Sequence, residues 1–171
     1  DQIVTSPADD ASFQEIAHRM QASVTAWQGG IRATGGAIVP EKSHWYLIDF
    51  VWTHGHWRYA TEAETPAQIS VQDSTGTEKM LERLAPDEAR RTLGVRLAPD
   101  GNCDDQFKFM VNVATEWGEH IRTGHLPRHL VWESMHTTIL RTLLYPLPAT
   151  TLSQKQCHQI MAPILGYHVP G

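Results

Sequence analysis

The chain has 171 residues, of which 41% are apolar and six are tryptophan, enough to build one domain or two small lobes. No stretch reaches the ~18 apolar residues of a membrane helix, and the first residues show no signal peptide, so we expect an intracellular protein without membrane contact. The net charge of −5 argues against strong, autonomous nucleic-acid binding, because free-standing binders are usually basic.

The first predicted element is a helix that begins after Ser12. Ser12 and Glu15 match a capping box. The apolar residues that follow have the spacing of one helical face: Ile16, Met20, Val24, Trp27 and Ile31. We expect the helix to pass through Gly29-Gly30, although two interior glycines cost about 2 kcal/mol and make a break there the alternative. The predicted end is Thr34-Gly35-Gly36.

Strands are predicted next. Residues 43–52 are rich in aromatic and β-branched types and predict a strand, which turns at 54–55 and returns over 56–60. Residues 68–72 and 77–81 flank the turn sequence "DSTG" and predict a second hairpin. Residues 91–102 predict a short strand followed by a turn.

The rest of the chain predicts helices. The first is capped by Asn102, stops at Gly124 and has the apolar stripe Phe107, Met110, Ala114, Trp117 and Ile121. The second begins at Pro127 and ends before Pro146, with the buried face Val131, Met135, Ile139 and Leu143.

A third helix is predicted after Ser153, which forms a capping box with Gln156, while Leu152 and Cys157 are spaced as a hydrophobic staple. This helix is expected to stop near Pro163. The order of elements therefore predicts an α+β lobe over residues 1–101, followed by a helical lobe over 102–171.

The sequence offers little for a metal site. His54 and His56 are two residues apart and could share a metal on one strand, but Gly55 marks a turn and no third ligand is near. We interpret them as exposed turn residues. The acidic pairs Asp9-Asp10 and Asp104-Asp105 precede or open helices, where carboxylates are favoured by the helix dipole. We expect no metal ligand, no catalytic residue and no cofactor within the chain.

Two further features have an ordinary interpretation. Cys103 and Cys157 are far apart in sequence and are expected to be reduced cysteines of an intracellular protein. The segment "GHLPRH" at 124–129 could face phosphate, but an inter-helix loop explains it more simply. Lys42 follows a glycine pair and a loop. A lysine there can neutralise a triphosphate or protonate a leaving pyrophosphate, although a solvated lysine is the more common case.

Four phrases, by their order and spacing, resemble the reverse transcriptases of eukaryotic retrotransposons: "TGGAIVPEKSHWYLIDF", "RTLGVRLAPDGN", "HIRTGHLPR" and "LLYPLPATTLSQKQCHQIMAPIL". The resemblance covers roughly residues 10–165 and corresponds to the region downstream of that family's catalytic Tyr/Phe-x-Asp-Asp motif. It implies a partial polymerase palm, a helix with antiparallel strands and hairpins, followed by a thumb-like helical bundle.

The resemblance also implies roles for individual residues. The glycine turn and lysine of motif D match Gly35, Gly36 and Lys42, so Lys42 would contact the phosphates of the incoming nucleotide. The primer grip matches Leu93-Gly94, where glycine would let the backbone approach the primer strand closely. From charge and position, the thumb's phosphate contacts would be Arg122, Arg128 and Arg141.

One departure from the family limits the activity. Polymerase chemistry in this family needs two Mg²⁺ ions held by aspartates of two palm motifs, and neither motif occurs in the chain. Residues 1–4 resemble the strand just after the second motif, and Asp9-Asp10 lacks the preceding strand.

We therefore expect a fragment of an RNA-directed DNA polymerase that takes part in nucleotidyl transfer on a template–primer and is inactive alone. The alternative is a non-enzymatic subunit of a larger assembly, derived from a retroelement, with protein partners that cover an exposed palm edge.

Overall fold

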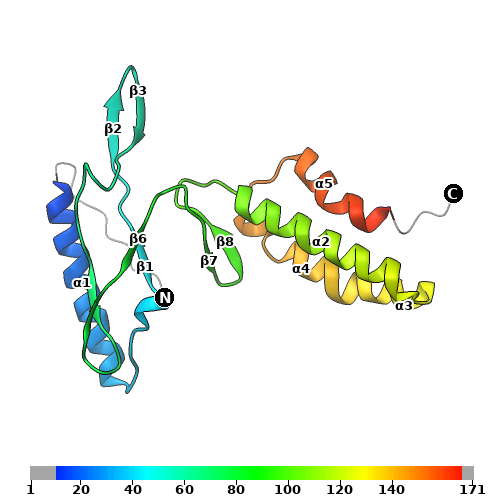
Figure 1. Ribbon diagram of the computed structural model, residues 1–171, viewed down its shortest axis with the longest axis horizontal. Coiled ribbons are helices and arrows are strands. Elements are labelled where there is room, and N and C mark those ends of the chain that lie inside the picture. The colour runs from blue at the N-terminus through cyan, green and yellow to red at the C-terminus, as the bar shows by residue number, and fades with distance from the viewer. Residues whose placement is uncertain (1–10, 167–171) are drawn as a thin grey trace. The chain divides into compact units, whose positions relative to one another are not determined.

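The computed structural model describes residues 11–166 and divides the chain into two compact units, Asp1–Glu88 and Ala89–Gly171, called unit 1 and unit 2 below. Unit 1 contains one long helix and short strand pairs, and unit 2 contains a hairpin followed by helices (Figure 1). The α+β class that the sequence predicts is confirmed. No helix within residues 11–166 is both long and apolar enough to span a bilayer.

The long helix of unit 1, α1 (Phe13–Ala33), begins by local capping chemistry. Ser12 is the N-cap, and its Oγ accepts a hydrogen bond from the Glu15 N–H at 3.3 Å. The Glu15 carboxylate pairs instead with Arg19, one turn further on, so only half of the predicted capping box forms. The helix passes through Gly29-Gly30 without a break, as predicted.

Helix α1 ends at the glycine pair in a Schellman motif. The Gly35 N–H donates to the Arg32 carbonyl and the Gly36 N–H to the Ile31 carbonyl, both at 2.9 Å. Gly35 has φ +81°, in the left-handed region, and a Cβ on Gly36 would lie 2.8 Å from Ile31 Cγ2. Both positions therefore need glycine, and the predicted end of the helix is confirmed.

The described part of unit 1 contains three strand pairs: β1 (His44–Tyr46) with β6 (Glu82–Leu84), β2 (Phe50–Thr53) with β3 (His56–Tyr59), and β4 (Ser70–Gln72) with β5 (Glu78–Met80). The β2–β3 and β4–β5 pairs are the two predicted antiparallel hairpins. The β1–β6 pair is parallel, with Trp45 opposite Arg83. The single strand predicted over 43–52 is wrong, because β1 and β2 pair with different partners and residues 47–49 between them belong to neither strand.

The core of unit 1 lies between α1 and these strands. Its buried members form one cluster: Val24, Trp45, Leu47, Ile69 and Val71. Helix α1 adds Phe13, Ile16 and Met20 at its border, as the periodicity predicts. Trp27 was expected in the same face but is 44% exposed, and Gln28 is buried in its place. Gln28 is buried because its side chain bonds the backbone of β4.

Two glutamines of α1 close the outer edge of β4. Gln21 accepts from the Ser70 N–H at 2.9 Å and donates to the Ser70 carbonyl at 3.0 Å. Gln28 makes the same pair of bonds with Gln72, at 3.2 and 3.0 Å. Each side-chain amide thus takes the place of one residue of a neighbouring strand, so this edge is not open to another chain.

Unit 2 begins with the hairpin of β7 (Arg90–Thr92) and β8 (Val95–Leu97). The elements that follow are α2 (Asp104–Gly124), α3 (Arg128–Ser134), the π-helical segment η2 (Met135–Ile139), α4 (Leu140–Leu144), the short η3 (Leu147–Ala149) and α5 (Gln154–Leu165). The strand predicted within 91–102 is in fact one arm of a hairpin that begins at Arg90. The predicted lobe boundary at 101/102 falls inside unit 2, because the hairpin belongs with the helices.

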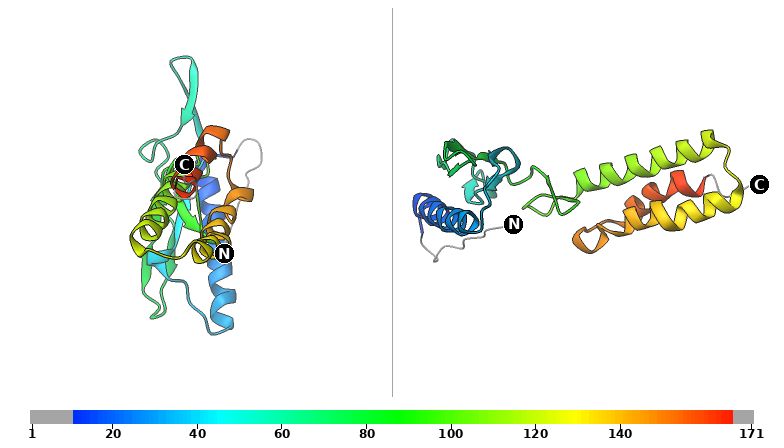
Figure 2. Two further views of the ribbon diagram at one scale, coloured as in Figure 1. Left: turned by 90° about the vertical axis from the view of Figure 1, so that its right-hand side faces the viewer. Right: turned by 90° about the horizontal axis from the view of Figure 1, so that it is seen from below.

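The helices of unit 2 pack along one another (Figure 2) and enclose a second core. Its buried members are Met110, Ala114, Met135, Ile139, Leu143, Ile160 and Ile164. The apolar faces predicted for the first two helices are confirmed at Met110, Ala114, Met135, Ile139 and Leu143. The second predicted helix is interrupted by the π-helical segment η2 and ends before Pro146 as expected.

The ends of α2 and α5 differ slightly from the prediction. Cys103 is the N-cap of α2, while Asn102 supports the helix start by accepting from the Asp104 N–H at 2.8 Å. The Ser153–Gln156 capping box forms as predicted. Helix α5 continues through Pro163 to Leu165 rather than stopping at the proline.

Candidate functional site

The turn of the β7–β8 hairpin has an unusual backbone. Leu93 has φ +50° and Gly94 has φ +89°, so both central residues lie in the left-handed region. Glycine adopts this conformation without strain, but a leucine there is unfavourable. The Leu93 side chain is 88% exposed, so it gains little from packing within the chain. The rest of unit 2 must therefore hold the turn in this shape.

Tyr145, the residue after α4, holds the turn. Its hydroxyl donates a hydrogen bond to the Leu93 carbonyl oxygen at 2.8 Å. Its ring also lies so close to the turn that a Cβ on Gly94 would be 3.2 Å from Tyr145 Cε1. Glycine at position 94 therefore serves two purposes, the positive φ and the close approach of the ring.

A cavity of about 510 Å³ lies between the hairpin, α2 and α4. Its lining residues come from all three elements and from the segment after α4: Arg91, Leu93, Gly94, Gln106, Phe109, Arg141, Thr142, Tyr145 and Pro146. Two of these residues are arginines, and none of them is acidic. The lining itself therefore carries a net positive charge.

Gln106, in the first turn of α2, is the most buried polar residue of this cavity, with 1% of its surface exposed. Its Oε1 accepts a hydrogen bond from the Arg96 N–H of β8 at 2.7 Å. Its Nε2 is buried without a hydrogen-bond partner among the described residues. Because a backbone N–H can only donate, the atom facing Arg96 must be the oxygen, and the amide group is fixed in this orientation.

The structure brings three of the predicted site residues together and separates two others from them. Leu93, Gly94 and Arg141 line the same cavity. Arg122 lies near the far end of α2 and pairs with Glu119, with Nη2 and Oε2 2.5 Å apart. Arg128 opens α3, just beyond that far end. A helix of the length of α2 spans about 30 Å, so these two arginines do not belong to the cavity.

Sequence reasoning missed Arg91, Gln106 and Tyr145. Arg91 precedes the turn in β7 and could have been found once the segment was interpreted as a hairpin rather than one strand. Gln106 has no local signal, because its bond to Arg96 and its burial depend on how α2 packs on β8. Tyr145 is 52 residues from Leu93, and no local pattern links them.

The predicted motif D residues lie in unit 1. Gly35 and Gly36 end α1, and Lys42 is the exposed last residue of the short helix η1 (Pro40–Lys42), which precedes β1. Lys42 was expected at the mouth of a strand, and it instead lies in a helical turn that Ser43 and β1 follow. Its side chain is open to solvent, as a phosphate contact requires.

The histidines of unit 1 lie where the sequence places them, in a turn. His54 (φ +50°) and Gly55 form the β2–β3 turn, and His56 begins β3, with both histidines exposed. No group of three or more His, Cys, Asp or Glu side chains is arranged to hold a metal within residues 11–166. Asp9-Asp10 and residues 1–4 lie outside the described residues.

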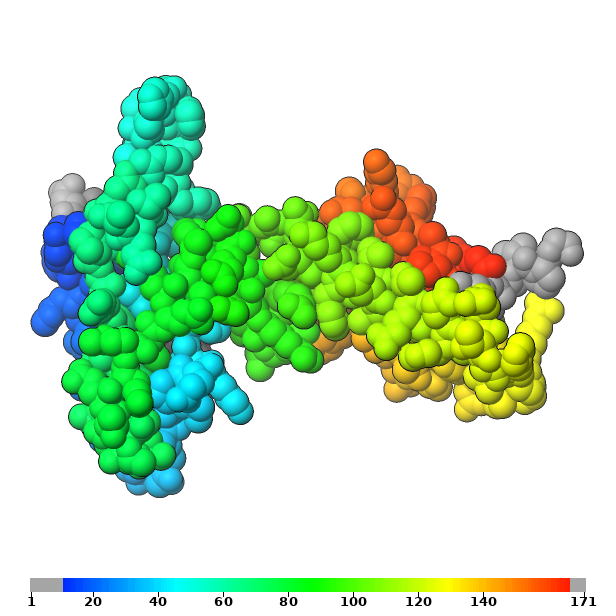
Figure 3. Space-filling view, viewed as in Figure 1, coloured from blue at the N-terminus to red at the C-terminus, as the bar shows by residue number. Residues whose placement is uncertain are grey.

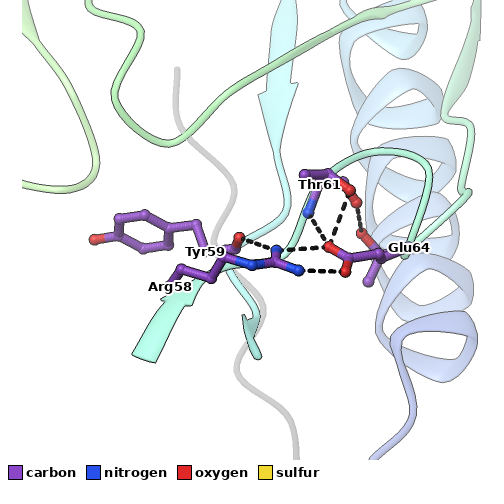
Figure 4. Close-up of polar contacts among 5 residues, drawn as sticks. Arg58, Tyr59, Thr61 and Glu64 are labelled. Carbon is purple, nitrogen blue, oxygen red and sulfur yellow. Dashed lines mark hydrogen bonds and ion pairs between the residues drawn. The ribbon is translucent and has the colours of Figure 1, made fainter. Parts of the chain in front are cut away.

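Arg58 of β3 and Glu64, five residues after the end of that strand, form a forked ion pair (Figure 4). Arg58 donates to both Glu64 oxygens, at 2.5 and 2.8 Å, and the Thr61 N–H and hydroxyl each donate to Glu64 Oε2 at 2.9 Å. The guanidinium, followed by the two Thr61 bonds, lowers the pKa of Glu64 from 4.5 to about 2. The two side chains thus neutralise each other within unit 1.

Charge is divided unevenly between the two units. Unit 1 has 6 Lys+Arg against 13 Asp+Glu, a net charge of −7, and unit 2 has 8 against 6, a net charge of +2. The chain's overall acidity therefore comes from unit 1. The cavity lies in the unit that is weakly basic, which suits an anionic ligand better than the whole-chain charge suggests.

The chain was compared with protein-family models, curated proteins and solved structures. No family model matches it, and neither a curated protein nor a solved structure shows significant similarity.

Proposed function

We propose that this chain is the primer-contacting part of a polymerase of the reverse transcriptase type, a palm remnant with a thumb-like bundle, and that it is inactive alone. The observation that carries the proposal is the exposed, left-handed Leu93-Gly94 turn held beside Arg141. Leu93 and Gly94 come from one phrase of the resemblance and Arg141 from its charge and position, and all three line one cavity.

The geometry of the turn suits contact with a nucleic-acid strand. Leu93 is 88% exposed at the tip of the turn, where a strand could contact it, and Tyr145 holds the turn in this shape from its other side. Arg91 and Arg141 add positive charge on the same side of unit 2, where a sugar–phosphate backbone would lie. In unit 1, the exposed Lys42 is available for the phosphates of an incoming nucleotide.

Catalysis requires parts that the described residues do not supply. In this proposal the two Mg²⁺ ions of the polymerase reaction are held by aspartates outside them. Residues 11–166 do not fit such a pair of ions, because no group of three or more potential ligands comes together there. We therefore derive no metal-dependent step for this chain, and its role is to position the template–primer.

Two assays on the full chain test the proposal. Fluorescence anisotropy with a labelled RNA–DNA template–primer should show binding that weakens steeply with salt, because phosphate contacts release counterions. Primer extension with Mg²⁺ or Mn²⁺ should yield no product. Absence of duplex binding at low salt would overturn the proposed contact, and template-dependent synthesis would overturn the proposed inactivity.

A matched glycine pair shows whether the turn carries the binding. Gly94→Ala adds a Cβ that strains the turn and crowds Tyr145, so duplex affinity should fall. Gly76 in the β4–β5 turn has a similar φ of +85° and lies in unit 1, where a Cβ would contact nothing. Gly76→Ala introduces the same kind of strain and should leave duplex affinity unchanged.

One observation favours the second candidate, a non-enzymatic subunit of an assembly. The β2–β3 hairpin projects from the rest of unit 1 (Figure 3). Its strand pairing places three exposed aromatic residues on one face. Phe50, Trp52 and Trp57 are 54%, 57% and 64% exposed, and the Trp52 and Trp57 rings pair edge to face with centroids 5.0 Å apart. Exposed tryptophans are typical of protein interfaces. A chain that binds no template–primer but elutes in a stoichiometric protein complex, lost in Trp52→Ser, would favour this candidate.

A further inference from the structure

We infer that the outer edge of β2 binds an extended, arginine-containing segment of a partner protein. The segment adds a strand to the β2–β3 hairpin and places its arginines on the aromatic side chains beside that edge. The inference rests on the second candidate function, because it names the chemistry of the partner in an assembly. It is independent of the proposed contact between unit 2 and a template–primer.

The backbone of the hairpin leaves its outer edges open. The Ala60 N–H donates to the Asp49 carbonyl at 2.9 Å, at the base of the hairpin. Because hydrogen-bonded and non-hydrogen-bonded pairs alternate along an antiparallel ladder, Trp52 and Trp57, three positions further on, form a non-hydrogen-bonded pair. Their N–H and C=O groups therefore point away from the partner strand. Neither backbone forms a hydrogen bond among the described residues.

The edge of β4 shows the opposite arrangement. Its outward N–H and C=O groups, on Ser70 and Gln72, are bonded by two glutamine side chains of α1. No described side chain does this for Trp52, and the hairpin projects from unit 1 (Figure 1). A two-stranded hairpin alone is only marginally stable, and an open edge accepts a further strand. The β2–β3 hairpin is therefore suited to strand addition.

The two edges of the hairpin differ in charge. At the β3 edge, the Arg58 guanidinium donates to the Tyr59 carbonyl at 3.0 Å (Figure 4). At the β2 edge, the Phe50 N–H donates to the Asp49 carboxylate at 2.8 Å, which holds a negative charge beside the strand. Asp49 forms no ion pair with another described residue. The β2 edge is therefore the better one for a cationic segment.

The sequence around the hairpin is also acidic. Residues 49–64 contain three acidic residues and one arginine, and that arginine, Arg58, is neutralised by Glu64. The surface that remains attracts positive charge, in agreement with the net charge of −7 for unit 1.

The aromatic side chains select the kind of cation and its spacing. Phe50 and Trp52 of β2 are both more than half exposed. Aromatic rings attract cations at their faces, tryptophan most strongly, and the planar guanidinium of arginine stacks on them. In an added strand, alternate side chains lie about 5 Å from these two residues. The partner should therefore carry arginines two residues apart.

Two other occupants agree less well with the surface. A second copy of the chain would bring together two units of net charge −7. The three exposed rings of the hairpin offer roughly 300 Å², well below the ~800 Å² per partner of a stable dimer. Bases of a single-stranded nucleic acid also stack on aromatic rings, but their phosphates need a positively charged groove. The acidic surroundings of the hairpin do not supply one.

The test is a ¹⁵N NMR titration of the full chain with a peptide of about eight residues in which arginine and threonine alternate. Threonine favours an extended backbone. The control peptide has the same composition, with all arginines first and all threonines after them. We expect saturable shifts over residues 50–59 and at least about fivefold tighter binding of the alternating peptide. Equal affinity of the two peptides, or shifts no larger in the hairpin than elsewhere, would overturn the inference.

Hydrogen exchange identifies the edge that the peptide occupies. At saturating alternating peptide, the Trp52 amide should exchange at least about tenfold more slowly, because it gains a hydrogen bond to the added strand. The Trp57 amide, on the opposite edge, is the internal control and should exchange as before. Protection of Trp57 alone, or of neither amide, would contradict strand addition to β2.

Matched substitutions test the ring. Trp52→Leu keeps an apolar side chain on β2 but removes the aromatic face, so affinity for the alternating peptide should fall about two- to fivefold. Trp132→Leu is the control, because Trp132 lies on α3 of unit 2 and is 59% exposed, against 57% for Trp52. That change should leave the affinity unaltered. An unaltered affinity in Trp52→Leu would contradict the role of the ring.

A charge substitution provides the same test without disturbing the aromatic pair. Asp49→Asn retains an oxygen that accepts from the Phe50 N–H and removes the negative charge. Affinity for the alternating peptide should fall about two- to fivefold, the range of an exposed ion pair. Glu41→Gln, at an exposed acid of η1, is the control and should have no effect. Equal affinities in Asp49→Asn and the unaltered chain would contradict the assignment to the β2 edge.

The outcomes also separate this inference from the proposed functions. Peptide binding without template–primer binding would overturn only the polymerase proposal. Template–primer binding without peptide binding would overturn only this inference. A stoichiometric complex that is lost in Trp52→Ser, from a chain that does not bind the alternating peptide, would support the second candidate function and overturn the arginine-containing partner.

Discussion

The two units treat their polar side chains differently. In unit 1 the long polar side chains bond within the unit: Gln21 and Gln28 bond the backbone of β4, Arg58 binds Glu64, and Arg83 donates to Thr65. In unit 2, Gln106, Arg91 and Arg141 converge on one cavity without partners for the amide Nε2 or for either guanidinium among the described residues. Unit 1 uses these polar groups to complete its fold, whereas in unit 2 the exposed Arg91 and Arg141 are not used in this way.

Unit 1 also buries one polar atom without a partner, Trp45 Nε1, but its setting is different. The Arg83 guanidinium lies 5.3 Å from the centre of the Trp45 ring, and this contact belongs to the core between β1 and β6. An unsatisfied atom alone therefore does not indicate a ligand site. The same holds for Gln106 Nε2, which is as inaccessible as Trp45 Nε1 even though the residue lines the cavity.

The largest expected effect tests whether the two units unfold independently of each other. Ile164→Ala removes a fully buried side chain from the unit 2 core and should cost about 2–5 kcal/mol of unfolding free energy. Urea denaturation followed by NMR should show early loss of the resonances of residues 90–97 and α2, with those of α1 and β4 retained. The neighbouring Leu165 is 53% exposed, and Leu165→Ala should change stability by less than about 0.5 kcal/mol. Simultaneous loss of both units in Ile164→Ala would contradict the division.

The next effect tests whether the glutamine side chains of α1 close the edge of β4. Gln28→Leu removes both bonds to the Gln72 backbone and leaves its N–H and carbonyl without their partner. We expect a loss of about 1–3 kcal/mol and faster hydrogen exchange at the Gln72 amide. Gln14→Leu, an exposed position on the same helix, is the control and should leave that amide protected. An unchanged exchange rate in Gln28→Leu would show that the side chain does not close the strand edge.

Local chemistry made the ends of the helices predictable, but not the glutamine bonds. The Ser12 cap, the glycines after α1 and the Ser153–Gln156 box each involve residues within a few positions of one another. The bonds of Gln21 and Gln28 span 49 and 44 residues, and no local pattern contains that information. The same reason explains the error at Trp27, because the strand partner decides which residue of the helix faces inward.

The candidate site was predictable only in part. The Leu93-Gly94 pair came from the resemblance and Arg141 from its charge and position, and a left-handed turn agrees with a glycine at position 94. The hairpin itself was missed because its strands, 90–92 and 95–97, have only three residues each and contain no aromatic residue. Gln106 was not foreseen because burial of a polar side chain depends on packing that the sequence of α2 does not express.

A smaller effect is expected for two glycine-to-alanine substitutions that should change stability in opposite directions. Gly94→Ala should destabilise unit 2 by about 1–2 kcal/mol, because alanine is strained at φ +89°. Gly29→Ala should stabilise unit 1 by about 0.5–1 kcal/mol, since Gly29 lies inside α1 and a Cβ there contacts nothing. Thermal unfolding of each variant checks the signs. A stabilising Gly94→Ala would show that the turn is not held in the left-handed conformation.

The smallest effect concerns pH and belongs to unit 1. The pKa of Glu64 is lowered from 4.5 to about 2, so its ionised form stabilises the fold. This contribution is complete above about pH 4.5 and is lost as the pH falls toward 2. The pKa of Asp73 is also lowered, chiefly by the Thr75 hydroxyl. Its ionised form therefore stabilises the fold as well, and this contribution is likewise lost on acidification. An NMR titration of the carboxyl carbons should place the Glu64 midpoint near 2, and a midpoint near 4.5 would mean that the pair with Arg58 does not form.

The charge pattern and the free donors lead to one central expectation, that nucleic acid contacts unit 2 at the β7–β8 turn. The most direct measurement is chemical-shift mapping of the full chain with an RNA–DNA template–primer. The account predicts the largest shifts at Arg91, Leu93 and Gly94, which Arg141→Gln should diminish. Shifts concentrated on the aromatic face of β2–β3, or none in unit 2 at saturating duplex, would contradict it.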